Sequence, residues 1–177
     1  MKICYNNNIK YYYAGIGSRK TPDNILIIMK NLAKSLSKRN YCLRSGGAIG
    51  ADSAFEYDCD LVNGSKEIFY VNDSNKFLIE FVKKYHPFFD NLSEYAKKLH
   101  SRNVLQMFGP KINEKEFSKF VVCWTPDGYG SNNNFKRTRL TSGTGTAIQI
   151  ALEHNIPVFN LQCMNIYDVI REIRGLE

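Results

Sequence analysis

The sequence predicts an α/β fold of the Rossmann-like, doubly wound kind, in which helices cover both faces of a mainly parallel sheet. β-type apolar runs alternate with helical patterns along the chain, and this alternation is typical of parallel sheets. Glycine-rich turns join strand-like runs to the helical patterns that follow them. The 177 residues are enough for one hydrophobic core and short for two, so we expect a single domain over residues 1–177.

Five runs have the composition of strands. The first is Tyr11-Tyr-Tyr-Ala-Gly-Ile16, and the most strongly β-type is Phe120-Val-Val-Cys-Trp124, because aromatic and β-branched side chains pack well on a pleated sheet. We expect strands at residues 11–16, 41–44, 66–71, 120–124 and 157–161. Parallel sheets bind ligands at the carboxyl ends of their strands, so the residues that follow these runs are the candidates for a site.

Helical patterns fill the intervals between the strands. Thr21-Pro-Asp23 has the features of a helix start, with Thr21 as the N-cap, and Asn40 ends that helix. His86-Pro87 separates two helices, because the residue before proline disfavours helical backbone angles. We expect helices at residues 22–39, 48–60, 75–85, 93–108, 143–153 and 165–174, and a polar loop at residues 126–141.

Three glycine-rich turns follow strand-like runs. They are Gly15-Ile-Gly-Ser-Arg19, Ser45-Gly-Gly-Ala-Ile-Gly-Ala-Asp52 and Thr141-Ser-Gly-Thr-Gly-Thr146. Glycine lets N–H groups approach a ligand, and a helix N-terminus adds unpaired donors and a positive dipole end, so these turns are expected to bind phosphate as well as to form tight turns. The turn residues expected to bind a nucleotide or its phosphate are Gly15, Gly17, Ser18, Arg19, Ser45, Gly46, Gly47, Ala48, Gly50, Asp52, Ser142, Gly143, Thr144, Gly145 and Thr146.

Acidic and polar side chains near the turns extend the candidate site. Asp52 either accepts a hydrogen bond from a ribose or base or only complements the helix dipole. Thr125 and Asp127 follow a strand and either contact the ligand or belong to an ordinary Pro-Asp-Gly turn. Glu56 lies one helical turn after Asp52 on the same face. The candidates for acid–base catalysis are therefore Asp52, Glu56 and Asp127.

The chain is basic, with a formal net charge of +7, which fits a polyanionic partner such as nucleic acid or a nucleotide. Lys136-Arg-Thr-Arg139 precedes the third glycine turn and either closes on a phosphate or forms a solvated charged run. No apolar run approaches the roughly 18 residues of a membrane span, and no signal-peptide pattern opens the sequence. We therefore expect a cytoplasmic location and no membrane partner.

Several common chemistries lack their motifs. There is no GxxxxGK[ST] for a P-loop and no GxSxG for a hydrolase, and Lys20 stands where a dinucleotide fingerprint starting at Gly15 would have its third glycine. The three histidines lack metal-ligand spacing, and the five cysteines are scattered. We expect neither a metal nor a cofactor. His86 fits a packed or capping histidine better than a catalyst.

The glycine turns resemble the Smf/DprA-type SLOG superfamily, which joins DNA-processing protein A, the Lonely-guy phosphoribohydrolases and molybdenum-cofactor carrier proteins. The resemblance rests on Gly15-Ile-Gly-Ser-Arg19 and Leu43-Arg-Ser-Gly-Gly-Ala-Ile-Gly-Ala-Asp-Ser-Ala-Phe-Glu56, and it extends over most of the chain. It is closest to compact phage-type DprA-like proteins. It implies a Rossmann-like fold, ligand contacts from Arg102 and Asn103, and association into a homodimer or a higher homo-oligomer.

Lonely-guy enzymes carry a Gly-Gly-x-Gly-Thr-x-Glu-Glu motif whose glutamate serves N-glycosidic cleavage. Ser142-Gly-Thr-Gly-Thr-Ala-Ile-Gln149 aligns with it and places Ile148 and Gln149 at the glutamate positions. We therefore expect a protein that binds a nucleotide, an ADP-ribose-like molecule or a cyclic nucleotide signal, and not an enzyme. The phage likeness implies a role in sequestering or sensing this ligand, in the host cytoplasm if the chain is viral.

Two other functions stay open. Single-stranded DNA binding in recombination would follow from the DprA resemblance and from the net charge of +7. An N-glycosidase that acts on nucleoside 5′-monophosphates would have to use Asp52, Glu56 or Asp127 in place of the absent glutamates.

Overall fold

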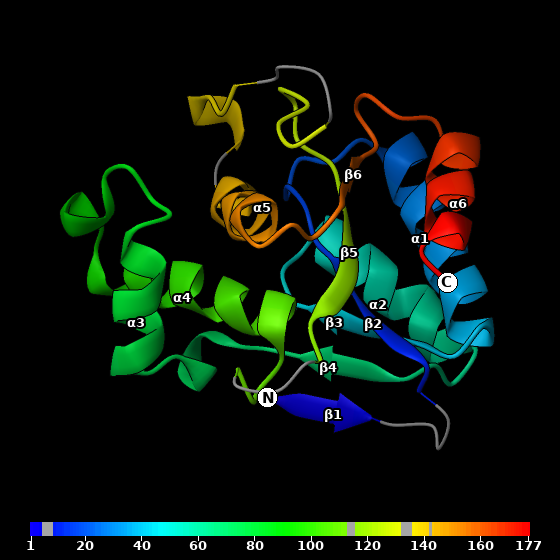
Figure 1. Ribbon diagram of the computed structural model, residues 1–177, viewed down its shortest axis with the longest axis horizontal. Helices are drawn as coiled ribbons and strands as arrows, with labels where there is room; N and C mark the ends of the chain where they lie inside the picture. Colours follow the sequence, from blue (N-terminus) through cyan, green and yellow to red (C-terminus); the bar gives the residue numbers. More distant parts are fainter. Residues whose placement is uncertain (5–8, 113–115, 132–135, 142) are drawn as a thin grey trace.

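The computed structural model describes residues 1–4, 9–112, 116–131, 136–141 and 143–177 (Figure 1). These residues form a six-stranded sheet in the order β1-β4-β3-β2-β5-β6. The strands are β1 (Lys2–Cys4), β2 (Tyr11–Gly15), β3 (Tyr41–Ser45), β4 (Lys66–Ile68), β5 (Ser118–Cys123) and β6 (Val158–Asn160). The α-helices are α1 (Asp23–Lys38), α2 (Ala51–Leu61), α3 (Lys76–Lys83), α4 (Glu94–Phe108), α5 (Thr144–Glu153) and α6 (Ile166–Gly175). Short 3₁₀ turns lie at Val71–Asp73, Phe89–Asn91 and Arg139–Thr141.

The strand order contains one topological switch. From β2 the chain steps to β3 and then β4 on one side, and it later adds β5 and β6 on the other side of β2. The strands β2 to β6 pair in parallel, and Ala14 of β2 lies opposite Arg44 of β3 and Val121 of β5. The switch therefore lies between β2 and β5. The crevice at the carboxyl ends of such a pair of strands is where α/β sheets bind ligands.

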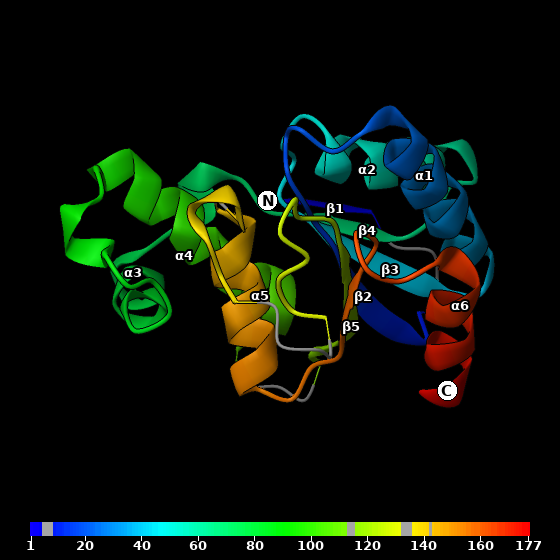
Figure 2. The same cartoon turned by 90° about the horizontal axis from the view of Figure 1, so that it is seen from above.

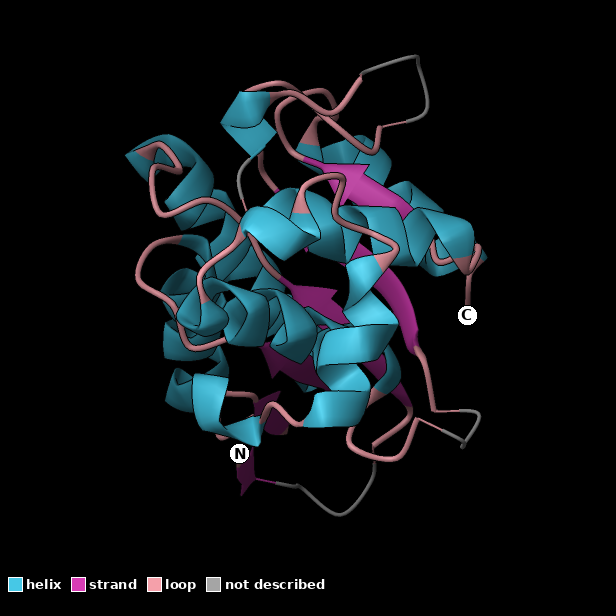
Figure 3. Ribbon diagram, turned by 90° about the vertical axis from the view of Figure 1, so that its left-hand side faces the viewer, coloured by secondary structure: helices cyan, strands magenta, loops and turns pink. Residues whose placement is uncertain are grey.

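Helices cover both faces of the sheet, as the sequence predicts. Successive side chains of a buried strand point to opposite faces, so each face needs its own layer of helices to cover its apolar side chains. Tyr13 of β2 packs among side chains of α1, α2 and α6, whereas Ala14 packs among side chains of α3, α4 and α5. Figure 2 shows these two groups of helices on opposite sides of the sheet. Seen from the side of α3, helices lie in front of the strands (Figure 3).

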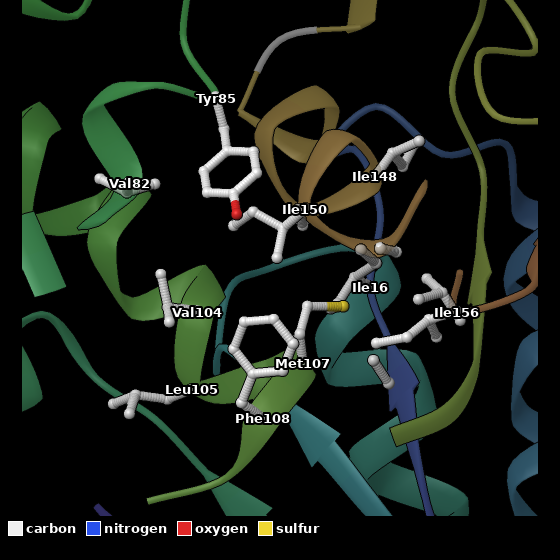
Figure 4. Close-up of a cluster of buried hydrophobic side chains, with 14 of the residues drawn as sticks. Ile16, Val82, Tyr85, Val104, Leu105, Met107, Phe108, Ile148, Ile150 and Ile156 are labelled. Atoms are coloured by element: carbon white, nitrogen blue, oxygen red, sulfur yellow. The ribbon is translucent and has the colours of Figure 1, made fainter. Parts of the chain in front are cut away.

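The core under α4 and α5 is built from aliphatic and aromatic side chains that the helical spacing directs inward (Figure 4). Met107, Ile148 and Ile150 are completely buried. Burial of one such side chain contributes about 1.5–3 kcal/mol, so this core fixes α4 and α5 against the sheet. The Tyr85 hydroxyl forms a hydrogen bond with His154 Nε2, 2.8 Å away.

The structure differs from the sequence predictions at element ends. β1 was not predicted, because a three-residue strand is too short for a recognisable alternation; it pairs antiparallel to β4 at the sheet edge, with Lys2 opposite Ile68. The strand predicted at residues 66–71 ends at Ile68. Thr21 is not the N-cap: Pro22 takes that position, and the Thr21 hydroxyl donates to the Ser18 carbonyl at 2.7 Å.

Candidate functional site

The three glycine turns lie at carboxyl ends of neighbouring strands or beside them. We call residues 15–19 the first turn, residues 45–52 the second turn and residues 141–146 the third turn. The first turn follows β2 and the second follows β3, which pair directly, and the third leads into α5 next to the loop that follows β5. Figure 1 shows the loop after β5 and the segment before α5 close together at the top of the molecule.

The first turn is fixed by its neighbours on both sides. Ser18 N–H donates to the Trp124 carbonyl at 3.3 Å, so the turn rests on the loop after β5. At Gly17 an added Cβ would lie 2.6 Å from the Ala51 Cβ, which leaves no room for a side chain at the start of α2. Arg19 is exposed. Gly17 therefore serves the contact between the first and second turns.

The second turn binds carboxylates of its own helix. Asp52 Oδ2 accepts from the N–H groups of Gly46 at 3.2 Å and Ala48 at 3.3 Å. Glu56 Oε1 accepts from Gly47 N–H at 3.1 Å and from the Ser45 hydroxyl at 2.6 Å. The donors that the sequence assigns to a phosphate are thus already paired within the chain.

Gly50 completes the second turn. Its φ of 99° lies in the region that favours glycine, and its N–H donates to Ser53 Oγ at 3.1 Å. An added Cβ there would lie 2.9 Å from the Ser18 carbonyl oxygen, so the first and second turns pack directly on each other.

Burial sets the charge state of the second turn. Burial raises the pKa of Asp52 to about 7, although Arg102 and the N–H groups of Ala48 and Gly46 act in the opposite direction. Burial likewise raises the pKa of Glu56 against the hydrogen bond from Ser45. Two carboxylates on one helical face do exist here, as the sequence predicts, but both are acceptors for the turn.

Basic side chains contact the third turn where it enters α5. Ser142 lies outside the described residues. Thr146 Oγ1 accepts from Arg137 Nη2 at 3.1 Å and lies 2.9 Å from His100 Nδ1. Arg137 Nη1 donates to the Tyr85 carbonyl at 2.9 Å. An added Cβ on Gly145 would lie 2.8 Å from Arg137 Nε, so this glycine admits the arginine across the start of α5.

α4 connects the second and third turns. Arg102 Nη1 donates to the Gly46 carbonyl, and Asn103 Nδ2 donates to the Gly143 carbonyl at 3.3 Å. Arg102 and Asn103, which the sequence ties to the site only through a family resemblance, therefore contact two different turns. In the first turn of α5, the N–H groups of Thr144 and Gly145 have no acceptor within the described part of the chain.

Asp127 and Thr125 hold the loop after β5 in place by accepting hydrogen bonds from other parts of the chain. Asp127 Oδ2 accepts from the Thr138 hydroxyl at 2.6 Å, from its N–H at 3.1 Å and from the Thr141 hydroxyl. Partial burial would raise the pKa of Asp127, but these hydrogen bonds outweigh it and the pKa lies below its ordinary value. Thr125 is completely buried and its hydroxyl accepts from Asn160 Nδ2 at 2.8 Å. Thr125 and Asp127 thus position the loop.

The histidines near the third turn are held neutral. Burial, together with the neighbouring His86, Arg137 and Arg102, lowers the pKa of His100 to about 4. Burial and Arg137 also lower the pKa of His86. His86 Nδ1 accepts from Phe88 N–H at 3.2 Å in the turn after α3, and its ring lies beside those of Phe89 and His100.

Comparison with known proteins supports the fold. No family model matches the chain, and no curated protein gives a significant match. A solved structure of DNA processing protein A from Helicobacter pylori, described for its single-stranded DNA binding mode, is similar with a TM-score of 0.55 and 16% sequence identity. The chain has a DprA-like fold. The similarity covers 86% of this chain and 65% of the H. pylori chain, so this chain spans less than two thirds of that protein.

Two contributors to the site were not predicted as site residues. Asn160, at the end of β6, bonds Thr125 and donates to the Tyr129 carbonyl at 2.8 Å, yet a lone asparagine after a strand has no motif. His100 belongs to α4 and reaches Thr146 only through the tertiary fold. Among the described residues no group of three or more His, Cys, Asp or Glu side chains gathers as a metal site requires. Within the same residues no helix has both the length and the apolar character to cross a bilayer.

Proposed function

We propose that the chain binds a phosphate-bearing, nucleotide-derived ligand at the carboxyl ends of its strands. The observation that carries this proposal is the arrangement at the third turn. There Arg137 lies across the start of α5, next to N–H groups of Thr144 and Gly145 that have no acceptor within the described chain. Fixed guanidinium groups and a helix N-terminus are the features that bind phosphate.

The three turns have different roles in this proposal. The third turn binds the phosphate, because the N–H groups of Thr144 and Gly145 have no acceptor among the described residues and the cationic Arg137 lies beside them. Ser18 and Arg19 of the first turn contact a more distant part of the ligand, since Arg19 is exposed. The second turn forms a wall of the site, because Asp52 and Glu56 already occupy its N–H groups.

Binding without cleavage is the form of the proposal that the carboxylates support. Asp52, Glu56 and Asp127 each accept hydrogen bonds that shape a turn or loop. Ile148 is completely buried, and Gln149 accepts from the Tyr129 hydroxyl and donates to Glu153. A protein that holds a nucleotide intact would carry, sequester or sense it.

A thermal-shift panel tests the proposal. The ligands are nucleoside mono-, di- and triphosphates, ADP-ribose derivatives, cyclic dinucleotides and short single-stranded DNA. One small nucleotide should stand out, because stabilisation grows as RT ln(1 + [L]/Kd). Its recovery unchanged by mass spectrometry would support binding, whereas release of free base would establish the N-glycosidase alternative. The proposal fails if no nucleotide binds with a micromolar or lower Kd.

Single-stranded DNA binding is the second candidate. It is favoured by the similarity to a protein described for that activity and by the net charge of +7. DNA binding releases several counterions, so the affinity would fall steeply with salt, whereas a ligand with one phosphate in a compact site would show a shallow slope. A shift with DNA alone that disappears at high salt would replace the nucleotide proposal.

A further inference from the structure

Three basic side chains from three segments lie beside the third turn, and a fourth, Arg102, extends from one of these segments toward Gly46 of the second turn. His86 comes from the turn after α3, His100 and Arg102 come from α4, and Arg137 precedes α5; we call them the cationic cluster. The ring centroids of His86 and His100 are 4.6 Å apart. His100 Nδ1 and Arg137 Nη2 lie 2.9 Å and 3.1 Å from the same atom, Thr146 Oγ1.

The cluster combines two permanent charges with two neutral rings. The groups that face His100 are His86, Arg137 and Arg102, and all three disfavour its protonation together with burial. Arg137 is the charged group that faces His86. Within the described chain no carboxylate is among the groups that shift the pKa of either ring.

Two carboxylates, those of Asp127 and Asp52, lie at the edges of the cationic cluster. Asp127 faces Arg137, where it favours the charged guanidinium, and Asp52 faces Arg102. Both acids already accept hydrogen bonds from turn or loop groups. Arg102 Nε is buried and has no partner within the described residues. The positive charge around the two rings is therefore incompletely compensated by the protein.

The hydrogen bonds at Thr146 leave His100 able to take a proton. Arg137 donates to the Thr146 hydroxyl oxygen, so the hydroxyl proton is available to His100 Nδ1. In that arrangement the neutral ring carries its own proton on Nε2. On protonation, Nδ1–H donates to Thr146 instead and the hydroxyl proton turns elsewhere.

We infer that the cationic cluster selects a doubly charged terminal phosphate over a singly charged phosphodiester, and that binding of the dianion is coupled to uptake of a solvent proton by His100. This inference rests on the proposed function, because it assigns the ligand phosphate to this cluster. An opposite charge within about 4–6 Å favours the protonated imidazole, and a dianion supplies twice the field of a diester. The ligand class is then a phosphate monoester with a free phosphate end, not the interior of a nucleic-acid strand.

The proton uptake is tested by NMR titration of His100 in the full chain. Sulfate keeps two negative charges across the titration, and methyl sulfate carries one, so the pair isolates the effect of charge. At matched ionic strength, saturating sulfate should raise the midpoint of the His100 titration by one pH unit or more, and methyl sulfate by less than a third of that. Equal shifts, or no shift with sulfate, would overturn the inference.

Two variants assign the effect to the cluster. Arg137→Met should weaken methyl phosphate binding at pH 7 by tenfold or more, whereas Arg139→Met, an exposed arginine of the same segment, should stay within twofold of the wild type. His100→Asn keeps a polar group beside Thr146 but cannot take the proton, so sulfate affinity should lose its rise toward low pH. An unchanged pH dependence in His100→Asn contradicts the coupling even if Arg137→Met does not fold.

The outcome separates this inference from the proposed function. A nucleotide that stabilises the protein while the His100 midpoint stays fixed would overturn the inference and leave the function standing. If sulfate moves His100 but no nucleotide stabilises the protein, the proposed function fails and the anion site remains. Dimethyl phosphate that binds as tightly as methyl phosphate would refute selection of the dianion.

Discussion

The second and third turns have similar sequences and opposite surroundings. In the second turn the N–H groups of Gly46, Gly47 and Ala48 bind Asp52 or Glu56 of the following helix. In the third turn Thr141 donates to Asp127, but at Thr146, inside the helix, the neighbours are His100 and Arg137, and no carboxylate shifts the pKa of that histidine within the described chain. A glycine-rich turn before a helix therefore identifies an anion site, but the chain itself supplies the anion in one case and leaves the position for a ligand in the other.

The largest expected effect is on the stability of the second turn. Asp52→Ala removes the carboxylate and leaves Arg102 and the N–H groups of Gly46 and Ala48 buried without it, so the free energy of unfolding should fall by about 3 kcal/mol. Urea denaturation measures this change. Arg137→Met at the third turn should cost less than about 1 kcal/mol, because it removes a partly exposed side chain. Equal losses in the two variants would erase the distinction between the turns.

The two turns should also respond to pH in opposite directions. The pKa of Asp52 is about 7 in the folded protein and about 3.9 when unfolded, so the folded state binds more protons in that range and this contribution to stability falls as the pH rises from 4 to 7. The pKa of His100 is about 4 when folded and about 6.5 when unfolded. The unfolded state binds more protons there, so this contribution rises from pH 4 to 6.5.

Replacing either group, Asp52 or His100, should reveal the pH dependence of stability that the other group contributes. Asp52→Asn leaves the histidine contribution, and its unfolding free energy should increase from pH 4 to 6.5 relative to the wild type. His100→Asn leaves the carboxylate contribution, and its stability should decrease over pH 4 to 7. The slope of one group is at most about 1.4 kcal/mol per pH unit, which denaturant titrations at several pH values resolve. Parallel profiles for the two variants would be incompatible with these charge states.

Alanine substitutions at Gly46 and Gly145 compare how tightly the second and third turns are packed. At Gly46 an added Cβ would lie 2.8 Å from the Arg102 guanidinium carbon and 2.9 Å from Asp52 Oδ2, so Gly46→Ala should destabilise the fold by about 1–3 kcal/mol. At Gly145 the contact is Arg137 Nε at 2.8 Å, and alanine is the better helix former. Gly145→Ala should leave stability within about 1 kcal/mol but displace Arg137 and weaken methyl phosphate binding several-fold. Calorimetric titration with thermal unfolding separates the two effects, and a Gly145→Ala protein that binds normally would exclude Arg137 from the site.

Much of this arrangement follows from the sequence, because alternating patterns predict a parallel sheet and the carboxyl ends of its strands must share one edge. Strand and helix positions such as those around Val121 and Val104 are carried by apolar spacing, and Asn40, with a φ of 62°, ends α1 as expected. The roles of the turns do not follow, since the same glycine and N–H pattern serves either an internal carboxylate or a ligand. Whether Asp52 turns back onto Gly46 depends on the geometry of the first turn of α2 and on Arg102, which lies far away in the sequence.

The smallest expected effect tests the role of the first turn, which contacts the second turn and the loop after β5. Ser18 Oγ accepts from Lys20 N–H at 3.0 Å, and Ser53 Oγ accepts from Gly50 N–H at 3.1 Å, so each serine satisfies one turn donor. Ser18→Ala and Ser53→Ala should each lower the unfolding free energy by about 0.5–1.5 kcal/mol. Ser18→Ala should in addition weaken nucleotide binding by two- to fivefold, because Ser18 faces the ligand side in the proposed function, whereas Ser53→Ala should not. If both variants bind the nucleotide from the thermal-shift panel with wild-type affinity, the first turn is structural like the second, and the ligand depends on the third turn alone.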